Sequence, residues 1–546
     1  MRKLTLVPLL CMLSVVSWAQ GIEPDVPDVN VPAEVLDMAS IVITEAEFGI
    51  PREAAAASFS HEVPLPELET VTIKEPVFAS RLPGTGITFP KQGGDRSIVS
   101  EMMLGTGSQS HVYGEVFLYT MRGLPTFELN FNHDSLEWYR DQSVGSFYYK
   151  RDDSVDGTLK ATIGKLGVEA AAGYADREIG LQSNSSYDIR IHRAVSTIFT
   201  ADYMVTEYFQ VSGAPELKLA SVQLKGASSK RMSELSAAID ISGELLFETM
   251  KFGLTSGYSF RTLVESPDPA INLTNHRLAA DLTLGIKLPF SDLYVDGHGG
   301  WLYSTALGHQ FPFSLGLAGA PFEFMSFDLR GGYAADELDA HDIFEAFEFA
   351  NLPDTVTDNY AWNGSLDTYF TLLDVISVEV GLGLAWNNSL PYFAPYDPAD
   401  PSASLVEGFF PLTFKNVLSV EPEIFLGWDV GSDFVLQLGW SAMFFGDTAL
   451  VPTNTIIFDG SGRGSSGRFG AGFSVRLLMG PPNPDIQLPY FDLNGYYRVT
   501  DNFKIMAAVT DVLAPLIGLS TGGSRYSWQP YEEPGLQADF GLQINL

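Results

Sequence analysis

Cysteine is almost absent from this sequence, because the only one among 546 residues is Cys11. It lies in an apolar stretch over residues 4–16, which follows the basic pair Arg2-Lys3 and precedes the small-x-small sequence Ser17-Trp18-Ala19. These features predict a secretory signal peptide over residues 1–19 that is removed after Ala19. The exported chain then contains no cysteine, so neither a disulfide nor thiol chemistry is expected in it.

The sequence also lacks long apolar runs and basic charge. No later segment has about 18 consecutive apolar residues, which excludes a transmembrane helix. The 32 Lys and Arg residues against 67 Asp and Glu residues give a net charge of −35, which argues against a nucleic-acid partner. Yet the mean hydropathy is +0.08, which is unusual for so acidic a chain and is typical of neither a coiled coil nor a disordered acidic tail.

Patterns that carry catalytic or metal chemistry are scarce as well. The eight histidines show no H-x-H or i,i+4 spacing that would support a zinc site, and the Asp-x-Asp-x-Asp-Gly spacing of a calcium loop is absent. Residues 518–522 match a nucleophile elbow, but such a serine needs a following helix and a later histidine, and the last histidine is His341. We interpret 518–522 as a turn or loop, and expect no enzyme activity, no cofactor and no metal.

The residues that are present divide the exported chain into two parts. Residues 20–94 are rich in proline, glutamate and valine, which predicts an extended arm with at most one short helix near 34–48. From about Ser97 to the last residue, apolar and polar residues alternate with a period of two, as in strands that have one apolar face. Residues 95–546 are therefore expected to form one all-β domain.

The alternation is clearest in five segments, 376–386, 418–428, 434–444, 468–478 and 536–546. Soluble sandwiches and transmembrane barrels both contain such strands, but a length of about 10–13 residues matches a tilted membrane strand. The polar face is rich in glycine, serine, glutamine and charge, as a wet lumen requires. Aromatic residues also lie at strand ends, as interfacial girdles do. These residues are Tyr360, Trp362, Trp386, Trp428, Phe444 and Phe445.

We therefore predict a transmembrane, antiparallel, up-and-down β-barrel with an even number of strands, about 18–22. With both barrel termini on the periplasmic side, strands 434–444 and 468–478 both run outward. A strand that runs back must lie between them, and residues 450–458 are the candidate although Pro452 weakens it.

Connection lengths extend this orientation to the rest of the domain, because periplasmic turns are short and extracellular loops are longer. We expect the long connections 336–354 and 387–404 outside the cell. We expect the short turns on the periplasmic side, namely Gly164-Lys165, Leu373-Asp374, 429–433 and 500–502.

The same alternation assigns charged residues to the lumen. One hypothesis is that acidic strands face basic strands across a constriction and filter solutes by charge. The alternative is that these residues form ordinary ion pairs that fill the lumen. The candidates are Glu379, Glu421, Glu423, Asp492 and Asp539, together with Arg468, Arg476 and Arg498.

The start of this region resembles TonB-dependent receptors. Glu69-Thr70-Val71-Thr72-Ile73 is similar to their energy-coupling box, an extended segment that adds a strand to the periplasmic partner TonB. The start of the barrel is also similar, over residues 103–107 and 112–120 and at Phe127, Leu129 and Phe131. Such receptors carry a globular plug between box and barrel, whereas only about twenty residues separate Ile73 from the first strand here. The resemblance implies a plug-less, receptor-like barrel, in which Thr70 to Ile73 are either a coupling box or a plain linker.

These observations predict an outer-membrane protein of a diderm bacterium, exported by the Sec route. Its function is expected to be a passive or gated solute channel or transporter, with the arm over 20–94 either occluding the lumen from below or engaging a periplasmic partner. The alternative is a non-conducting barrel that serves adhesion, structure or docking. The expected partners are outer-membrane lipids and the barrel-assembly machinery, which would recognise the alternating C-terminal strand although Leu546 replaces the usual aromatic residue.

Overall fold

The computed structural model describes residues 98–545, all within the compact unit Pro66–Leu546. The predicted signal peptide, the arm and the box residues Glu69, Thr70, Val71, Thr72 and Ile73 lie outside the described residues and stay predictions. The described range also excludes 121–124, 138–146, 183–185, 267–273, 289–291, 338–342, 344–347, 352–357, 373–374, 394–404, 432, 465, 481–487, 522–525 and 529–530.

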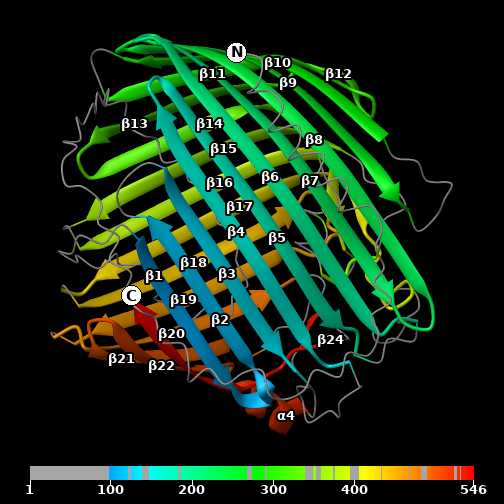
Figure 1. The fold of residues 1–546 in the computed structure, drawn as a ribbon, viewed down its shortest axis with the longest axis vertical. Helices are drawn as coiled ribbons and strands as arrows, with labels where there is room; N and C mark the ends of the chain where they lie inside the picture. Colours follow the sequence, from blue (N-terminus) through cyan, green and yellow to red (C-terminus); the bar gives the residue numbers. More distant parts are fainter. Residues whose placement is uncertain are drawn as a thin grey trace. The chain divides into compact units, whose positions relative to one another are not determined.

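Most of the described residues lie in β-strands (Figure 1). The first half contains β1 (Ile98–Gly107), β2 (Val112–Thr120), β3 (Thr126–Leu136), β4 (Lys150–Ile163), β5 (Leu166–Gly180), β6 (Ile189–Thr206), β7 (Phe209–Lys225), β8 (Ser229–Leu246), β9 (Met250–Glu265), β10 (Thr274–Lys287) and β11 (Leu293–Ser304). The second half contains β12 (Gly308–Gln310), β13 (Phe313–Phe322), β14 (Met325–Asp336), β15 (Asn359–Leu372), β16 (Ile376–Tyr392), β17 (Thr413–Asp429), β18 (Phe434–Phe445), β19 (Thr453–Arg463), β20 (Phe469–Met479), β21 (Tyr490–Thr500), β22 (Phe503–Thr510), β23 (Tyr526–Trp528), β24 (Tyr531–Glu532) and β25 (Gln537–Asn545).

The helices of the described chain are short. They include the 3-10 turn η2 (Ser108–Ser110) and α4 (Ala514–Thr521), and no described helix is long and apolar enough to cross a membrane. Helix α4 corrects the expectation of a turn or loop at 518–522. Pro515 lies in the first turn of α4, where its missing N–H leaves no helical hydrogen bond unmade, so it is compatible with the start of this helix.

The main sheet closes on itself into a barrel. Each wall strand pairs antiparallel with its neighbour in sequence, and β1 pairs with both β2 and β25. Strands β12 and β13 both pair with β11 and are interrupted at Pro312, which has no N–H to donate to the ladder, so they form one wall strand. The barrel therefore has 22 strands, which confirms the predicted fold class and lies at the upper end of the predicted range.

The two ends of the barrel differ in the length of their connections. At the end where β1 begins and β25 ends, the turns are short, such as 164–165, 207–208, 323–324 and 501–502. The opposite end carries the long connections 137–149, 337–358, 393–412 and 511–536. The first end is therefore periplasmic and the second extracellular, as predicted. Leu373 and Asp374 lie outside the described residues.

The strand inferred from phase alone is present as β19, which runs from the extracellular end to the periplasmic end. It covers Thr453–Arg463 rather than 450–458, because Pro452 cannot donate to the ladder and the strand begins directly after it.

The outer face of the barrel is apolar. Trp362, Trp386, Trp428 and Phe444 are exposed near strand ends, as a girdle at the lipid boundary requires. Phe445 was wrongly assigned to this girdle. It follows Phe444 on β18 and so points to the opposite face, where its ring lies 5.9 Å from that of Tyr392. An apolar band of this kind around a closed barrel of this size places the protein in an outer membrane.

One part of the wall is taller than predicted. Strands β6 and β8 have 18 residues and β7 has 17, and all three are drawn as long arrows in Figure 1. Their added length lies at the extracellular end. There the outward-facing side chains are charged, as in the ion pair of Arg193 with Asp176, and the inward-facing ones include Val222 and Met232. The wall thus rises above the lipid and presents an apolar inner surface at the mouth.

Candidate functional site

All but one of the eight predicted lumen charges lie on the lumen face of their strands. Glu423 on β17, for example, is flanked by Ile424, which is exposed on the outer face. Arg468 is the exception, because it lies in the turn before β20, where its carbonyl oxygen accepts a hydrogen bond from the backbone N–H of Arg498 at 2.6 Å. The residues on the lumen face are Glu379, Glu421, Glu423, Arg476, Asp492, Arg498 and Asp539.

The three predicted glutamates lie together. Register places Glu423 opposite Gly381, and Gly381 opposite Asp367 of β15, so these positions form one row across three strands. The Glu423 side chain lies across Gly381, where an added Cβ would be 2.5 Å from its Cγ. Among the described residues, Glu379, Glu421 and Glu423 form no ion pair, although Ser419 donates a hydrogen bond to Glu421 at 3.1 Å.

The acidic row continues around the lumen. Asp328 lies opposite Asp367, and Asp240, Asp281 and Asp296 carry the same charge on β8, β10 and β11. Several of these side chains also lie across a glycine of the next strand, as Glu423 does. The counter-ions are few, such as Arg330 beside Asp328 at 3.0 Å. We call this set the acidic belt, which consists of Asp240, Asp281, Asp296, Asp328, Asp367, Glu379, Glu421 and Glu423.

The two predicted arginines that face the lumen lie on β20 and β21. Arg476 Nη2 is 2.9 Å from Asp492 Oδ2, so these two predicted residues form an ion pair with each other. Arg498 lies opposite Lys504 on β22, so two like charges face the lumen next to the periplasmic turn. The structure therefore groups the predicted glutamates, pairs Arg476 with Asp492, and leaves Arg498 away from both.

Asp539 belongs to the strand pairing that closes the barrel, which we call the seam. His111, in the connection between β1 and β2, lies between two carboxylates, with Nδ1 2.7 Å from Asp539 and Nε2 3.0 Å from Asp134. Burial lowers the pKa of His111, but its hydrogen bonds to Asp134 and Asp539 and their charges outweigh this and raise the pKa to about 9. A protonated His111 therefore bridges β3 and β25 across β1 and β2. Sequence reasoning missed His111, because nothing in the local pattern reveals a partner more than 400 positions away.

Described residues from three long connections lie at the mouth of the barrel. We call these connections the mouth loops: 337–358, 393–412 and 511–536. Loop 337–358 is fixed at its base, where Arg261 of β9 lies 3.2 Å from Glu337 and 2.8 Å from Asp358. Its middle reaches β4, where Lys150 Nζ is 3.1 Å from Glu348. Because β4 and β14 lie far apart around the barrel, this loop spans the mouth.

The other two mouth loops contact the same wall and each other. Glu407 lies 2.7 Å from Lys230 of β8, and the backbone N–H of Glu532 donates to Gln182 Oε1 at 2.7 Å. Loops 337–358 and 393–412 are joined by a parallel bridge between Ala350 and Phe410. The described parts of the three loops therefore contact one another and form a single cover.

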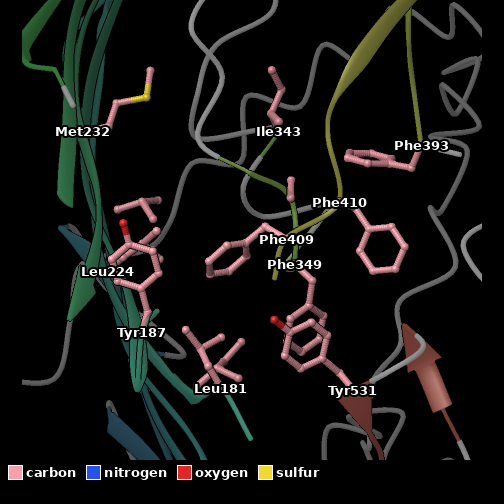
Figure 2. Close-up of a cluster of buried hydrophobic side chains, with 13 residues drawn as sticks. Leu181, Tyr187, Leu224, Met232, Ile343, Phe349, Phe393, Phe409, Phe410 and Tyr531 are labelled. Atoms are coloured by element: carbon pink, nitrogen blue, oxygen red, sulfur yellow. The ribbon is translucent and has the colours of Figure 1, made fainter. Parts of the chain in front are cut away.

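An apolar cluster holds this cover against the tall wall (Figure 2). The rings of Phe349 and Tyr531, from two different mouth loops, stack at 4.0 Å, and Phe409 is fully buried beside Tyr187. Phe409 and Phe410 form an adjacent aromatic pair just beyond the predicted outer loop 387–404, a sequence signal for buried contacts that period-two alternation does not reveal. The cluster consists of Ile179, Leu181, Tyr187, Val222, Leu224 and Met232 around the wall and Ile343, Phe349, Ala350, Phe393, Phe409, Phe410 and Tyr531 from the mouth loops.

Comparison with known proteins finds similarity in structure only. No family model matches the sequence, and no curated protein matches it. Among solved structures, the FrpB iron transporter from Neisseria meningitidis is 10% identical with a TM-score of 0.60, and covers 83% of this chain and 82% of its own. The copper transporter OprC is 13% identical with a TM-score of 0.61, and covers 84% and 81%.

A further similar structure is that of a mutant of the ferric enterobactin receptor PfeA from Pseudomonas aeruginosa. It is 10% identical with a TM-score of 0.59, and covers 84% of this chain and 81% of its own. Identities this low establish the fold rather than a shared activity. The described residues therefore have the 22-strand barrel fold of TonB-dependent receptors, the family that the sequence resembles.

Proposed function

We propose that this protein is a gated transporter that carries a solute across the outer membrane, and that the three mouth loops are its extracellular gate. The single observation that carries this proposal is the cover itself: loops from one side of a 22-strand barrel reach the opposite wall and close over a charged lumen. Similarity to an iron transporter, a copper transporter and a ferric enterobactin receptor supports the same class of function.

The contacts of the cover differ in strength in the way that a hinged gate requires. The base ion pair of Arg261 and Asp358 is buried, with side chains 9% and 2% exposed, and breaking such a pair costs about 3–5 kcal/mol. The outer pair of Lys150 and Glu348 is 36% and 32% exposed, and such pairs contribute about 0–1 kcal/mol. Loop 337–358 is therefore held firmly at its base and weakly where it meets β4.

The lumen below the gate favours cationic solutes. The acidic belt places eight carboxylates on β8 to β17 with few counter-ions, and the Glu379, Glu421 and Glu423 group has none among the described residues. A wall of this charge attracts cations and repels anions within a narrow aqueous path. We therefore propose a cation or a cationic complex as the transported solute.

We also propose that the arm over residues 20–94 acts at the periplasmic end of the barrel. It either occludes the lumen from below or engages a periplasmic partner through Glu69 to Ile73 by β-augmentation. Deletion of the arm separates the two roles, because an occluding arm lowers conductance when present, whereas a docking arm leaves the conductance of the isolated barrel unchanged.

A cross-linking experiment tests the gate. The variant Lys150→Cys/Glu348→Cys is refolded as residues 20–546, which contain no other thiol, and is treated with a cleavable bifunctional thiol reagent. Single-channel conductance in planar bilayers should fall on cross-linking and return on cleavage. The matched control is Lys160→Cys/Glu169→Cys, an ion pair at 3.3 Å between adjacent wall strands, where cross-linking should change nothing. Equal conductance with and without the 150–348 cross-link would refute the gate.

A non-conducting barrel for adhesion or docking is the second candidate, and the apolar cluster favours it. The cluster buries six residues around the wall against seven from the mouth loops, an arrangement that also suits a permanently closed mouth. No conductance from the refolded chain, from the arm deletion or from a variant without loop 393–412, with a heat-modifiable barrel confirmed in each sample, would establish this alternative.

A further inference from the structure

A second polar region of the lumen lies on β19 to β21, outside the acidic belt. Its centre is Ser474 of β20, which is buried and lies opposite both Asp459 of β19 and Asp492 of β21. Arg476 is two residues further along β20 on the same face, and Asn494 is two residues beyond Asp492 on β21. These five polar side chains face the lumen in one patch on three adjacent strands, with Arg476 and Asn494 on opposite sides of Ser474.

Two of these side chains satisfy each other. Arg476 donates from Nη2 to Asp492 Oδ2 at 2.9 Å, and the backbone N–H of Asp511 donates to Asp492 Oδ1 at 2.8 Å. The Arg476 guanidinium carbon also lies 5.6 Å from the centre of the Tyr490 ring. The charge of Asp492 is therefore compensated, and the orientation of Arg476 is fixed from two sides.

Three polar atoms of this patch have no hydrogen-bond partner among the described residues. They are Asp459 Oδ1, Arg476 Nε and Asn494 Nδ2, and all three are shielded from solvent. The Asn494 amide lies over Gly472, where an added Cβ would be 3.0 Å from its Oδ1 and 3.3 Å from its Nδ2. Shielded polar atoms are destabilising unless they are paired, so three of them around one serine require an explanation.

We infer that this patch is a solute-binding site for a protonated amine that stands next to a neutral hydrogen-bond acceptor, such as a carbonyl or hydroxyl oxygen. Among the described residues, the Asp459 carboxylate has no cation partner, so it accepts from the amine, while Asn494 Nδ2 donates to the neighbouring acceptor. Because Arg476 is neutralised by Asp492, the patch as a whole carries one uncompensated negative charge, which matches one amine.

The donor set also distinguishes an organic amine from a bare metal ion. The described residues contain no group of three or more His, Cys, Asp or Glu side chains arranged to hold a metal. Two of the three unpaired atoms are N–H donors, which a metal ion cannot satisfy. The role of the site in transport depends on the proposed function, but the binding itself does not.

Binding is therefore measured without transport. The refolded chain, residues 20–546 in detergent micelles, is titrated with glycinamide, which carries an amine beside a carbonyl, and binding is followed by ligand-observed NMR. Asp459→Asn should weaken binding at least about tenfold, the effect of losing a charge-assisted hydrogen bond. Asn494→Ala should weaken it about fivefold while leaving every charge in place. N-acetylglycinamide, which lacks the amine, should bind the native chain no better than it binds Asp459→Asn.

The matched control is Asp202→Asn, which removes a lumen carboxylate that lies opposite Gly167 on a distant part of the wall. It should bind glycinamide as the native chain does, and heat-modifiability confirms that each variant has folded. Equal affinity of the native chain and Asp459→Asn, or no binding by either, would overturn the site and leave water as the partner of the three atoms. If glycinamide bound this site but the barrel never conducted, the proposed transporter function would be refuted, whereas the binding site would stand.

Discussion

The gate proposal depends most on Phe409, because this side chain is fully buried between two mouth loops and the wall. Its ring lies 6.1 Å from that of Tyr187, near the wall, and the neighbouring Phe410 is bridged to Ala350. The substitution Phe409→Ala removes the ring and leaves the backbone bridge intact. It therefore weakens the packing of the closed cover without changing any charge at the mouth.

The size of the effect follows from burial. Truncating a fully buried phenylalanine to alanine costs about 3–5 kcal/mol, of which part is recovered if the neighbouring rings collapse into the space. Since about 1.4 kcal/mol corresponds to a factor of ten, the ratio of closed to open cover should fall by about a hundredfold or more. The Lys230–Glu407 pair next to it is 39% and 37% exposed and contributes no more than about 1 kcal/mol, so it cannot compensate.

Two assays measure this change. Single-channel recording should show a higher open probability, and glutamyl endopeptidase should cleave after Glu407 faster in the variant than in the native chain. The control is Phe540→Ala, which removes an outward-facing ring of β25 that is 51% exposed. If open probability and cleavage rate both stayed at native values while the barrel remained heat-modifiable, the cluster would not hold the gate.

Three other perturbations follow from the described residues. Because the pKa of His111 is raised from 6.5 to about 9, its contribution to the seam should be complete below pH 6.5 and be lost as the pH rises through 9, by at most about 3 kcal/mol. His111→Asn should remove this pH dependence of the unfolding midpoint in urea. Glu379→Gln/Glu423→Gln should lower cation selectivity, seen as a smaller reversal potential in a salt gradient. Arg476→Ala should raise cation selectivity, because it leaves Asp492 uncompensated, and an unchanged reversal potential in either variant would contradict the assigned lumen charge.

The fold could be predicted in detail because lipid imposes a strict demand on sequence. Each membrane strand must present an apolar side chain at every second position, so the predicted segments 376–386 and 434–444 lie within β16 and β18. Direction could be predicted too, since strands in an up-and-down barrel alternate and β19 was required between two outward strands. Its bounds were wrong at both ends, because Pro452 cannot donate to the ladder and the strand runs over Thr453–Arg463 rather than 450–458.

The mouth could not be predicted in the same way. Above the membrane the outer face meets water, so the alternating pattern no longer reports which side faces the lumen, and β6 and β8 continue past the expected length. The cover depends on contacts between residues far apart in sequence, such as Lys150 and Glu348. Nothing local to either residue indicates the other. Aromatic pairs in polar loops, such as Phe409-Phe410, were the available signal.

The lumen charges show that strand register determines which charged side chains form ion pairs, whereas alternation indicates only which face they lie on. Alternation placed Arg476 and the glutamates on the same face and suggested opposed acidic and basic walls. Register then puts Asp492 one diagonal step from Arg476, and this ion pair removes Arg476 from any opposing field. The other predicted arginine on the lumen face, Arg498, lies opposite Lys504 beside the periplasmic turn rather than across from the acidic belt. We therefore expect the field in the lumen to run along the barrel axis, negative at the belt and positive near the periplasm. A cation attracted to the belt should then meet a barrier near the periplasmic end of the lumen.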